Sequence, residues 1–236
     1  MAGDQVANLV GRQRLALALD VDDLIEALRL ARQLKRWFGV AKVGLELFSA
    51  VGPDIVSELI AEDYRVFLDL KMADIPTTVE KAARVHGALG VSYLTMHAFT
   101  GPTMLRAGVA GLTEGASRAG LDPPAALAVT VLTSDLGAPS HIVGKRVAAA
   151  AEARCAGVVC AARDVREVKR LAPAMVAVVP GIRPLGIDVD DQGRPATPAD
   201  AMVAGADLLV IGRAVTGAPD RVRAAEDLMA SMAVVG

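Results

Sequence analysis

The sequence predicts a single (β/α)8 barrel, and three observations lead to this prediction. Short aliphatic runs alternate eight times with longer amphipathic segments along the 236 residues. The runs are rich in Ala, Val and Leu, as expected for parallel strands covered on both faces. Polar residues recur at the ends of these runs, where a barrel of this kind carries its site. The alternative is an open doubly wound sheet, but a dinucleotide-binding version is disfavoured because no GxGxxG follows the first run.

The aliphatic runs are expected to form the eight strands of the barrel. Each is short, rich in β-branched or aliphatic residues, and followed by turn-forming or polar residues. In chain order, the expected strands are Leu15–Leu19, Val40–Gly44, Val66–Leu70, Val91–Met96, Ala126–Leu132, Gly157–Cys160, Met175–Val179 and Leu208–Ile211.

The segments between the runs predict helices. The segment that starts at Asp22 opens with a capping acid and then repeats its apolar residues every three or four positions. Thr197, Pro198 and Asp200 give a strong helix start, with a capping Thr, a Pro in the first turn and an acid three residues after the cap. The remaining expected helices are Thr78–Leu89, Gly101–Arg118, Ser140–Ala153, Asp164–Leu171, Thr197–Ala204 and Pro219–Met232.

The bulk composition favours one soluble domain. We expect residues 1–236 to form a single domain, with 1–12 as an irregular N-terminal segment, because no linker or low-complexity segment interrupts the chain. The formal net charge of −2 gives no electrostatic basis for binding nucleic acid or an acidic membrane.

The mean hydropathy of +0.41 is high, so a membrane-spanning segment has to be considered. The stretch between Arg84 and Arg106 lacks charges but contains Gly, Pro and His, which makes it a poor spanning helix. The N-terminus also lacks the layout of a signal peptide, so we expect a cytoplasmic protein. Cys155 and Cys160 have neither a disulfide-framework nor a zinc spacing, and are expected to be reduced core thiols.

Charged residues of alternating sign fall on the first three expected strands. Asp20 follows the first strand, Lys42 lies in the second, and Asp69 and Lys71 lie on the third. Because Asp69 and Lys71 are two residues apart, they should project from the same side of their strand. Opposite charges about 4 Å apart attract by about 4 kcal/mol at an effective dielectric of about 20, so each charge can be held by its neighbours. A structural ion network is one interpretation. A site that stabilises or protonates a developing carbanion is the other, and it is favoured.

The ends of the last two strands predict a phosphate site. Pro180-Gly-Ile-Arg183 follows the seventh strand, and Gly212-Arg213 follows the eighth. Barrels commonly bind phosphate at this place, through backbone N–H groups and Arg side chains. Gln192, in the loop after Arg183, could add a neutral donor.

The chain resembles the orotidine 5′-phosphate decarboxylase family, nearly from end to end. The resemblance is carried by LALD at Asp20, KVGLELF at Lys42, FLDLKMADIPTT, MHAFTG, AVTVLTS at Thr133, GVVC, PGIRP, DQGR, ATP and IGRAVT. The DxKxxD pattern followed by IPTT is the most specific of these blocks. It implies decarboxylation of orotidine 5′-monophosphate to UMP and CO2, in de novo pyrimidine biosynthesis, without a metal or a cofactor.

The resemblance also implies a role for each matching residue. Lys71 would lie against C6 of the base and deliver the proton, and Asp69 would lie beside the departing carboxylate. Asp74 and Thr78 would reach the active site of the neighbouring subunit of a homodimer. Asp20 and Lys42 would bind the ribose and complete the charged array, with Lys42 among the catalytic residues. The other implied substrate contacts are Thr133 at the pyrimidine, Arg183, Gln192, Gly212 and Arg213 at the phosphate, and Ile75 and Pro180.

Two other functions stay open at this point. Sugar-phosphate enzymes of the same superfamily resemble this barrel and use a DxKxxD strand, but they work with magnesium, and their pattern usually has Ala-Gly where this chain has Ile75-Pro76. A nucleotide-phosphate binder without catalysis would need only the phosphate end. The complete set of Asp69, Lys71 and Asp74 argues against such a binder.

Overall fold

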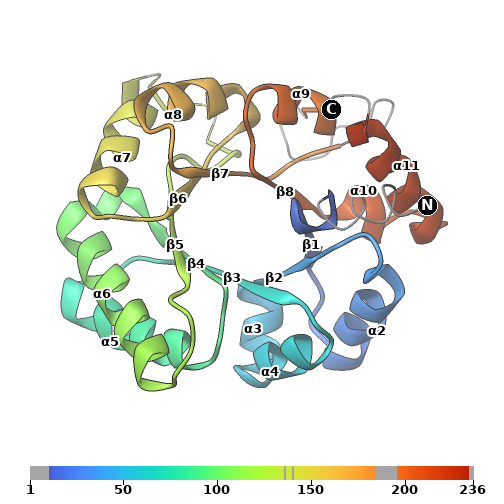
Figure 1. Ribbon diagram of the computed structural model, residues 1–236, viewed down its shortest axis with the longest axis horizontal. Coiled ribbons are helices and arrows are strands. Elements are labelled where there is room, and N and C mark those ends of the chain that lie inside the picture. Colours follow the sequence, from blue (N-terminus) through green and yellow to red (C-terminus); the bar gives the residue numbers. More distant parts are fainter. Residues whose placement is uncertain (1–10, 136, 140, 184–195, 234–236) are drawn as a thin grey trace.

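The eight strands close into a parallel barrel, which confirms the predicted fold class. The computed structural model describes residues 11–135, 137–139, 141–183 and 196–233. The strand order is β1 to β8 in sequence, and β8 pairs with β1 to complete the closure. Figure 1 shows the strands at the centre, with the helices arranged around them.

The observed strands agree closely with the predicted ones. They are β1 (Leu15–Leu19), β2 (Val40–Gly44), β3 (Arg65–Met72), β4 (Tyr93–His97), β5 (Ala125–Val129), β6 (Gly157–Val159), β7 (Val176–Val179) and β8 (Leu208–Ile211). The largest error concerns β5, which ends three residues before the predicted Leu132. The apolar run continues past the last strand pairing because Val131 is buried in the loop that follows.

The helices between the strands cover the outside of the barrel. They are α2 (Leu24–Leu34), α3 (Leu45–Val51), α4 (Asp54–Ala61), α5 (Pro76–Ala88), α6 (Pro102–Arg118), α7 (His141–Glu152), α8 (Val165–Leu171), α9 (Pro198–Val203), α10 (Arg213–Thr216) and α11 (Arg221–Ala233). Sequence patterns did not predict α3, α4 or α10. Both predicted helix starts are confirmed. The cap of α2 is Asp23, the residue after Asp22, which accepts a hydrogen bond from the backbone N–H of Glu26, and the cap of α9 is Thr197, which accepts one from that of Asp200.

The predicted irregular segment 1–12 lies almost entirely outside the described residues. Gly11 and Arg12 are helical, and the carbonyl of Arg12 accepts a hydrogen bond from the N–H of Gly39. No helix in the described ranges combines the length and apolar character needed to cross a bilayer.

Two apolar layers stabilise the barrel. The larger lies between strands and helices, and the smaller fills the barrel interior. Both predicted core thiols are confirmed as free and buried. The interior layer matters for function because it forms an apolar floor below the charged residues. Its members are Ala16, Ala18, Val40, Phe67, Leu127, Val129, Val159, Val178, Leu208 and Val210.

The helices α5 and α6 approach each other unusually closely and lie side by side in Figure 1. A Cβ added at Gly111 would lie 2.1 Å from the carbonyl oxygen of Glu80, and one at Gly115 would lie 1.9 Å from that of Arg84. Glycine is therefore required at both contacts. This packing fixes α5, whose first residue follows directly on the predicted site residues Asp74 and Ile75.

Candidate active site

A cavity of about 270 Å³ opens at the carboxyl ends of the strands. Its floor is the interior layer, including Ala18, Phe67 and Val129, and its walls carry most of the predicted site residues. The predicted residues that line it are Asp20, Lys42, Asp69, Lys71, Thr133, Pro180, Arg183, Gly212 and Arg213. The structure thus brings together residues that are up to 193 positions apart (20 to 213).

Asp20 and Lys42 form the first charged pair of the cavity. Lys42 Nζ donates to Asp20 Oδ1 over 2.9 Å. The Lys42 side chain is 10% exposed and that of Asp20 is 57% exposed, so the ammonium is buried while its partner contacts solvent. Gly44 leaves the room that this arrangement needs, because a Cβ there would lie 3.2 Å from Lys42 Nζ.

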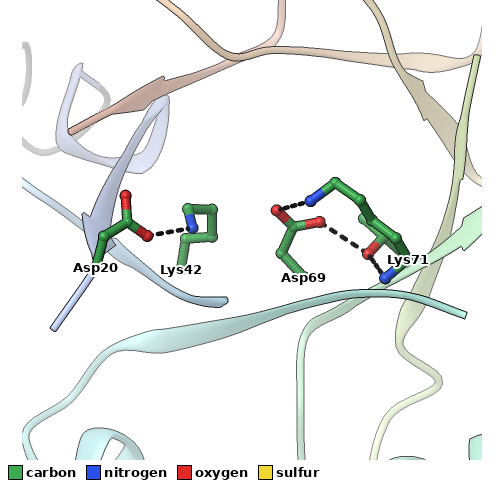
Figure 2. A network of polar contacts seen from close by, with 5 residues as sticks. Asp20, Lys42, Asp69 and Lys71 are labelled. Carbon is green, nitrogen blue, oxygen red and sulfur yellow. Dashed lines mark hydrogen bonds and ion pairs between the residues drawn. The ribbon is translucent and has the colours of Figure 1, made fainter. Parts of the chain in front are cut away.

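Asp69 and Lys71 form the second pair, and Figure 2 shows both pairs projecting into the same space. Lys71 Nζ donates to Asp69 Oδ2 over 2.7 Å, and both side chains are largely buried. The expectation that the two residues lie on the same side of β3 is confirmed by this contact. Their charges are matched within each pair, which explains how this strand end tolerates them.

The backbone that presents Lys71 is not a regular strand. Between the pairings Leu68↔Leu94 and Met72↔Met96, β3 advances four residues and β4 advances two, so β3 carries two extra residues (4 − 2 = 2). Lys71 has a φ of +50°, which is uncommon for a residue with a side chain. A bulge of this kind re-aims side chains and is frequent beside active sites.

Thr95 is a site residue that the sequence did not reveal. It is fully buried in β4, where its Oγ1 donates to Asp69 Oδ1 and accepts from the backbone N–H of Lys71, each over 2.9 Å. The only signal in the sequence is a hydroxyl in an otherwise apolar strand, which a packing role explains equally well.

The predicted residues after Lys71 do not reach the cavity of their own chain. Asp74 is exposed and accepts a hydrogen bond from the N–H of Ile75, whose side chain is 66% exposed. Thr78 is also exposed, in the first turn of α5. Asp74, Ile75 and Thr78 are not among the residues that line the cavity of their own chain.

The predicted phosphate-binding residues follow β7 and β8, and β8 pairs with β1, the strand that leads to Asp20. Arg183 is buried, and its backbone N–H donates to the carbonyl of Ala196, in a short bridge beside Ile182↔Ala196. Gly212 lies between β8 and α10, with no atom closer than 3.6 Å to a Cβ placed on it. Gln192 lies outside the described residues. Arg183 and Arg213 both line the cavity here, beside the partly buried backbone of Gly181 and Gly212.

His97 ends β4 but does not line the cavity. Burial lowers the pKa of its imidazole, and the nearby Lys71 and Arg146 lower it further, against an opposing effect of Asp69. Its ring lies 4.9 Å from that of Phe99. A neutral imidazole beside the ammonium of Lys71 adds no competing positive charge.

No three His, Cys, Asp or Glu side chains of the described residues are grouped as a metal site. The cavity holds two ammonium groups paired with carboxylates, and Arg183 and Arg213 are also among its lining residues. This arrangement suits a substrate that carries an anionic group and also develops negative charge at its reacting centre.

Comparisons with known proteins identify the family to which the chain belongs. The model of the "Orotidine 5'-phosphate decarboxylase / HUMPS family" matches residues 13–228. The chain belongs to this family. A relative from Moorella thermoacetica, named orotidine 5′-phosphate decarboxylase, is 40% identical over 243 aligned positions, covering 98% of this chain and 96% of its own. One of the same name from Parasynechococcus marenigrum is 45% identical, covering 88% and 89%.

Solved structures of the family share the fold. The crystal structure of orotidine 5′-phosphate decarboxylase from Lactobacillus acidophilus has a TM-score of 0.76 at 31% identity, covering 93% of this chain and 99% of its own. That from Pyrococcus horikoshii has a TM-score of 0.74 at 26% identity. The resemblance stated from the motifs is thereby confirmed over almost the whole chain.

Proposed function

We propose that this protein decarboxylates orotidine 5′-monophosphate to UMP and CO2, as a step of pyrimidine biosynthesis. The observation that carries the proposal is the Asp69–Lys71 pair, 2.7 Å apart, in a cavity that Arg183 and Arg213 also line. The relatives that match nearly the full chain carry the name of this carboxy-lyase.

The reaction requires that C6 of the base hold an electron pair when CO2 leaves. The C6–carboxylate bond breaks, its electrons remain on C6, and the ammonium of Lys71 donates a proton to form the new C–H bond. The same ammonium stabilises the negative charge before the transfer, because it is held by Asp69 above an apolar floor that contains Phe67. Asp69 lies beside the departing carboxylate, and the repulsion between these two negative charges ends when neutral CO2 leaves.

The rest of the substrate is bound by the remaining cavity residues. Asp20 and Lys42 bind the ribose hydroxyls, Thr133 and Pro180 contact the base, and Gly212 and the two arginines bind the phosphate, together with Gln192. Binding energy from the phosphate is useful although phosphate does not react, since it can hold the substrate in the closed, water-poor site. No metal or cofactor has a part in this mechanism.

The enzyme works as a homodimer in this proposal. Asp74, Ile75 and Thr78 are exposed in their own chain, and Phe99, which follows β4, is 60% exposed. Exposed residues at the end of the DxKxxD motif and in the IPTT that follows it are suited to complete the cavity of a second copy. We also propose a cytoplasmic location without nucleic-acid or membrane partners.

The reaction is tested by following the ultraviolet absorbance of orotidine 5′-monophosphate with purified protein in excess EDTA. Continuous loss of substrate with formation of UMP is expected. The matched comparison uses a sugar phosphate with magnesium, the conditions of the related superfamily enzymes. Turnover of the sugar phosphate alone, or nucleotide turnover that EDTA abolishes, would contradict the proposal.

The shared site is tested by mixing two inactive variants. Asp74→Ala and Lys71→Ala are each expected to lack activity. After random exchange of subunits about half of the dimers are mixed, and one of the two sites in each mixed dimer has both Lys71 and Asp74, so about a quarter of the parent activity should return. A mixture that stays inactive after subunit exchange has been demonstrated would refute the shared site.

A further inference from the structure

The left-handed backbone conformation of Lys71 has to be stabilised by specific contacts. A residue with a side chain at a φ of +50° persists only where its surroundings fix it. Lys71 lies in the bulged part of β3, so regular pairing with β4 does not fix this segment. The polar contact of its backbone N–H is therefore a candidate for what fixes this conformation.

That contact is made by a single hydroxyl, Thr95 Oγ1, which accepts from the N–H of Lys71 over 2.9 Å. Because an amide can only donate, this bond leaves the hydroxyl hydrogen free for another acceptor. The acceptor is Asp69 Oδ1, also at 2.9 Å. The other carboxylate oxygen, Oδ2, accepts from Lys71 Nζ over 2.7 Å.

These three bonds form a closed arrangement around the reacting ammonium. The hydroxyl fixes the backbone from which Lys71 extends and also the rotation of the carboxylate that receives its Nζ. Thr95 is fully buried and does not line the cavity, so it has no direct contact with a substrate. A bond to an ionised group in a dry surrounding is also stronger than one between neutral groups.

We propose that Thr95 is a positioning residue for the decarboxylation, which acts through the orientation of Asp69 and Lys71. The proposal rests on the proposed function. It predicts a specific pattern: the loss of the hydroxyl slows the chemical step while the affinity for nucleotide is unchanged, because the binding residues do not depend on Thr95.

The test replaces Thr95 by Val, which keeps the shape and removes the hydroxyl. We expect kcat to fall roughly 10- to 100-fold, the range given by one hydrogen bond to a charged group. KM and the affinity for UMP should stay within about threefold. Thr95→Ser keeps the hydroxyl and should retain most of kcat. If the Val variant does not fold, Thr95→Ala removes the same hydroxyl without a new methyl group beside the carboxylate.

The matched control is Thr130→Val. Thr130 is equally buried, but its hydroxyl donates to the carbonyl of Val159 and not to a charged group. It should lose stability while kcat stays within about threefold. Equal losses of kcat in Thr95→Val and Thr130→Val would overturn the proposal. A kcat of Thr95→Ser as low as that of Thr95→Val would overturn it too.

A second readout does not depend on turnover. Exchange of the Lys71 amide hydrogen, followed by NMR, should accelerate in Thr95→Val and stay slow in Thr95→Ser. If the intact protein shows no turnover, the proposed function fails, while this exchange still tests the role of Thr95. Unchanged exchange in the Val variant would refute the positioning role even in an active enzyme.

Discussion

The two members of the Asp20–Lys42 pair should respond very differently to neutralisation. Asp20→Asn removes the partner of an ammonium that is only 10% exposed, whereas Lys42→Met removes the ammonium and leaves a carboxylate that is 57% exposed. A buried charge without its partner is costly, while a solvated one is not. We therefore expect Asp20→Asn to destabilise the free enzyme and Lys42→Met to be close to neutral or stabilising.

The magnitude follows from the geometry. At 2.9 Å and an effective dielectric of about 20, the attraction is about 6 kcal/mol. Because more than half of Asp20 is in contact with water, screening reduces the net contribution to about 1–2 kcal/mol. For a chain of this length, Asp20→Asn should lower the Tm by roughly 2–8 °C. In the background of Lys42→Met, the same change should have almost no effect.

The assay is a double-mutant cycle on the free energy of unfolding in urea, at a fixed protein concentration. The single tryptophan, Trp37, is buried and reports unfolding by its fluorescence. A coupling energy below about 0.3 kcal/mol, or a Lys42→Met variant less stable than Asp20→Asn, would refute the reasoning that these charges hold each other.

Three further results are expected. Gly115→Ala should lower the free energy of unfolding by about 3 kcal/mol or more, measured in urea, since the new Cβ meets the backbone carbonyl of Arg84 at 1.9 Å. Burial raises the pKa of both Cys155 and Cys160 to about 12, so a thiol reagent at pH 8 should modify them slowly in the folded protein and rapidly in urea. Burial lowers the pKa of His86 below its ordinary 6.5, so the unfolded state binds its proton first as the pH falls. Stability should then decrease from pH 7 to 5, and less steeply in His86→Leu.

Each of these expectations has a contradicting outcome. If the free energy of unfolding of Gly115→Ala stays within about 0.5 kcal/mol of the parent, as is typical of a surface substitution, the α5–α6 packing adjusts easily. Rapid modification of either thiol without denaturant would show that the core opens locally. An identical pH slope in the His86 variant would assign the acid sensitivity to other groups.

The strands were predictable because their pattern is local. β1, β2 and β8 begin and end at the predicted residues, since each is an aliphatic run bounded by turn or polar residues. The end of β5 was predicted too late, because burial of Val131 in the following loop imitates a continuing strand. The helices α3 and α4 were missed between Gly44 and Arg65, where a Gly-Pro pair interrupts two short segments.

The charged residues of the site were predictable, but the backbone conformation and the hydrogen bonds that position them were not. Asp69 and Lys71 stand out because charges are rare in a buried run, and the spacing of two places them together. The bulge and the positive φ of Lys71 depend on pairing with β4, which no spacing within β3 reveals. Thr95 was missed for the same reason, since its role exists only across the two strands.

The central claim is that Lys71 performs metal-free decarboxylation in this cavity. The most direct measurement compares kcat of the intact protein and of Lys71→Ala with orotidine 5′-monophosphate in excess EDTA, after UMP binding has shown that the variant's site is folded. The intact protein should turn over the nucleotide, and the variant should lose at least about 1,000-fold, since it lacks both the proton donor and the stabilising charge. A variant that binds UMP and keeps kcat within tenfold of the intact protein would contradict the account.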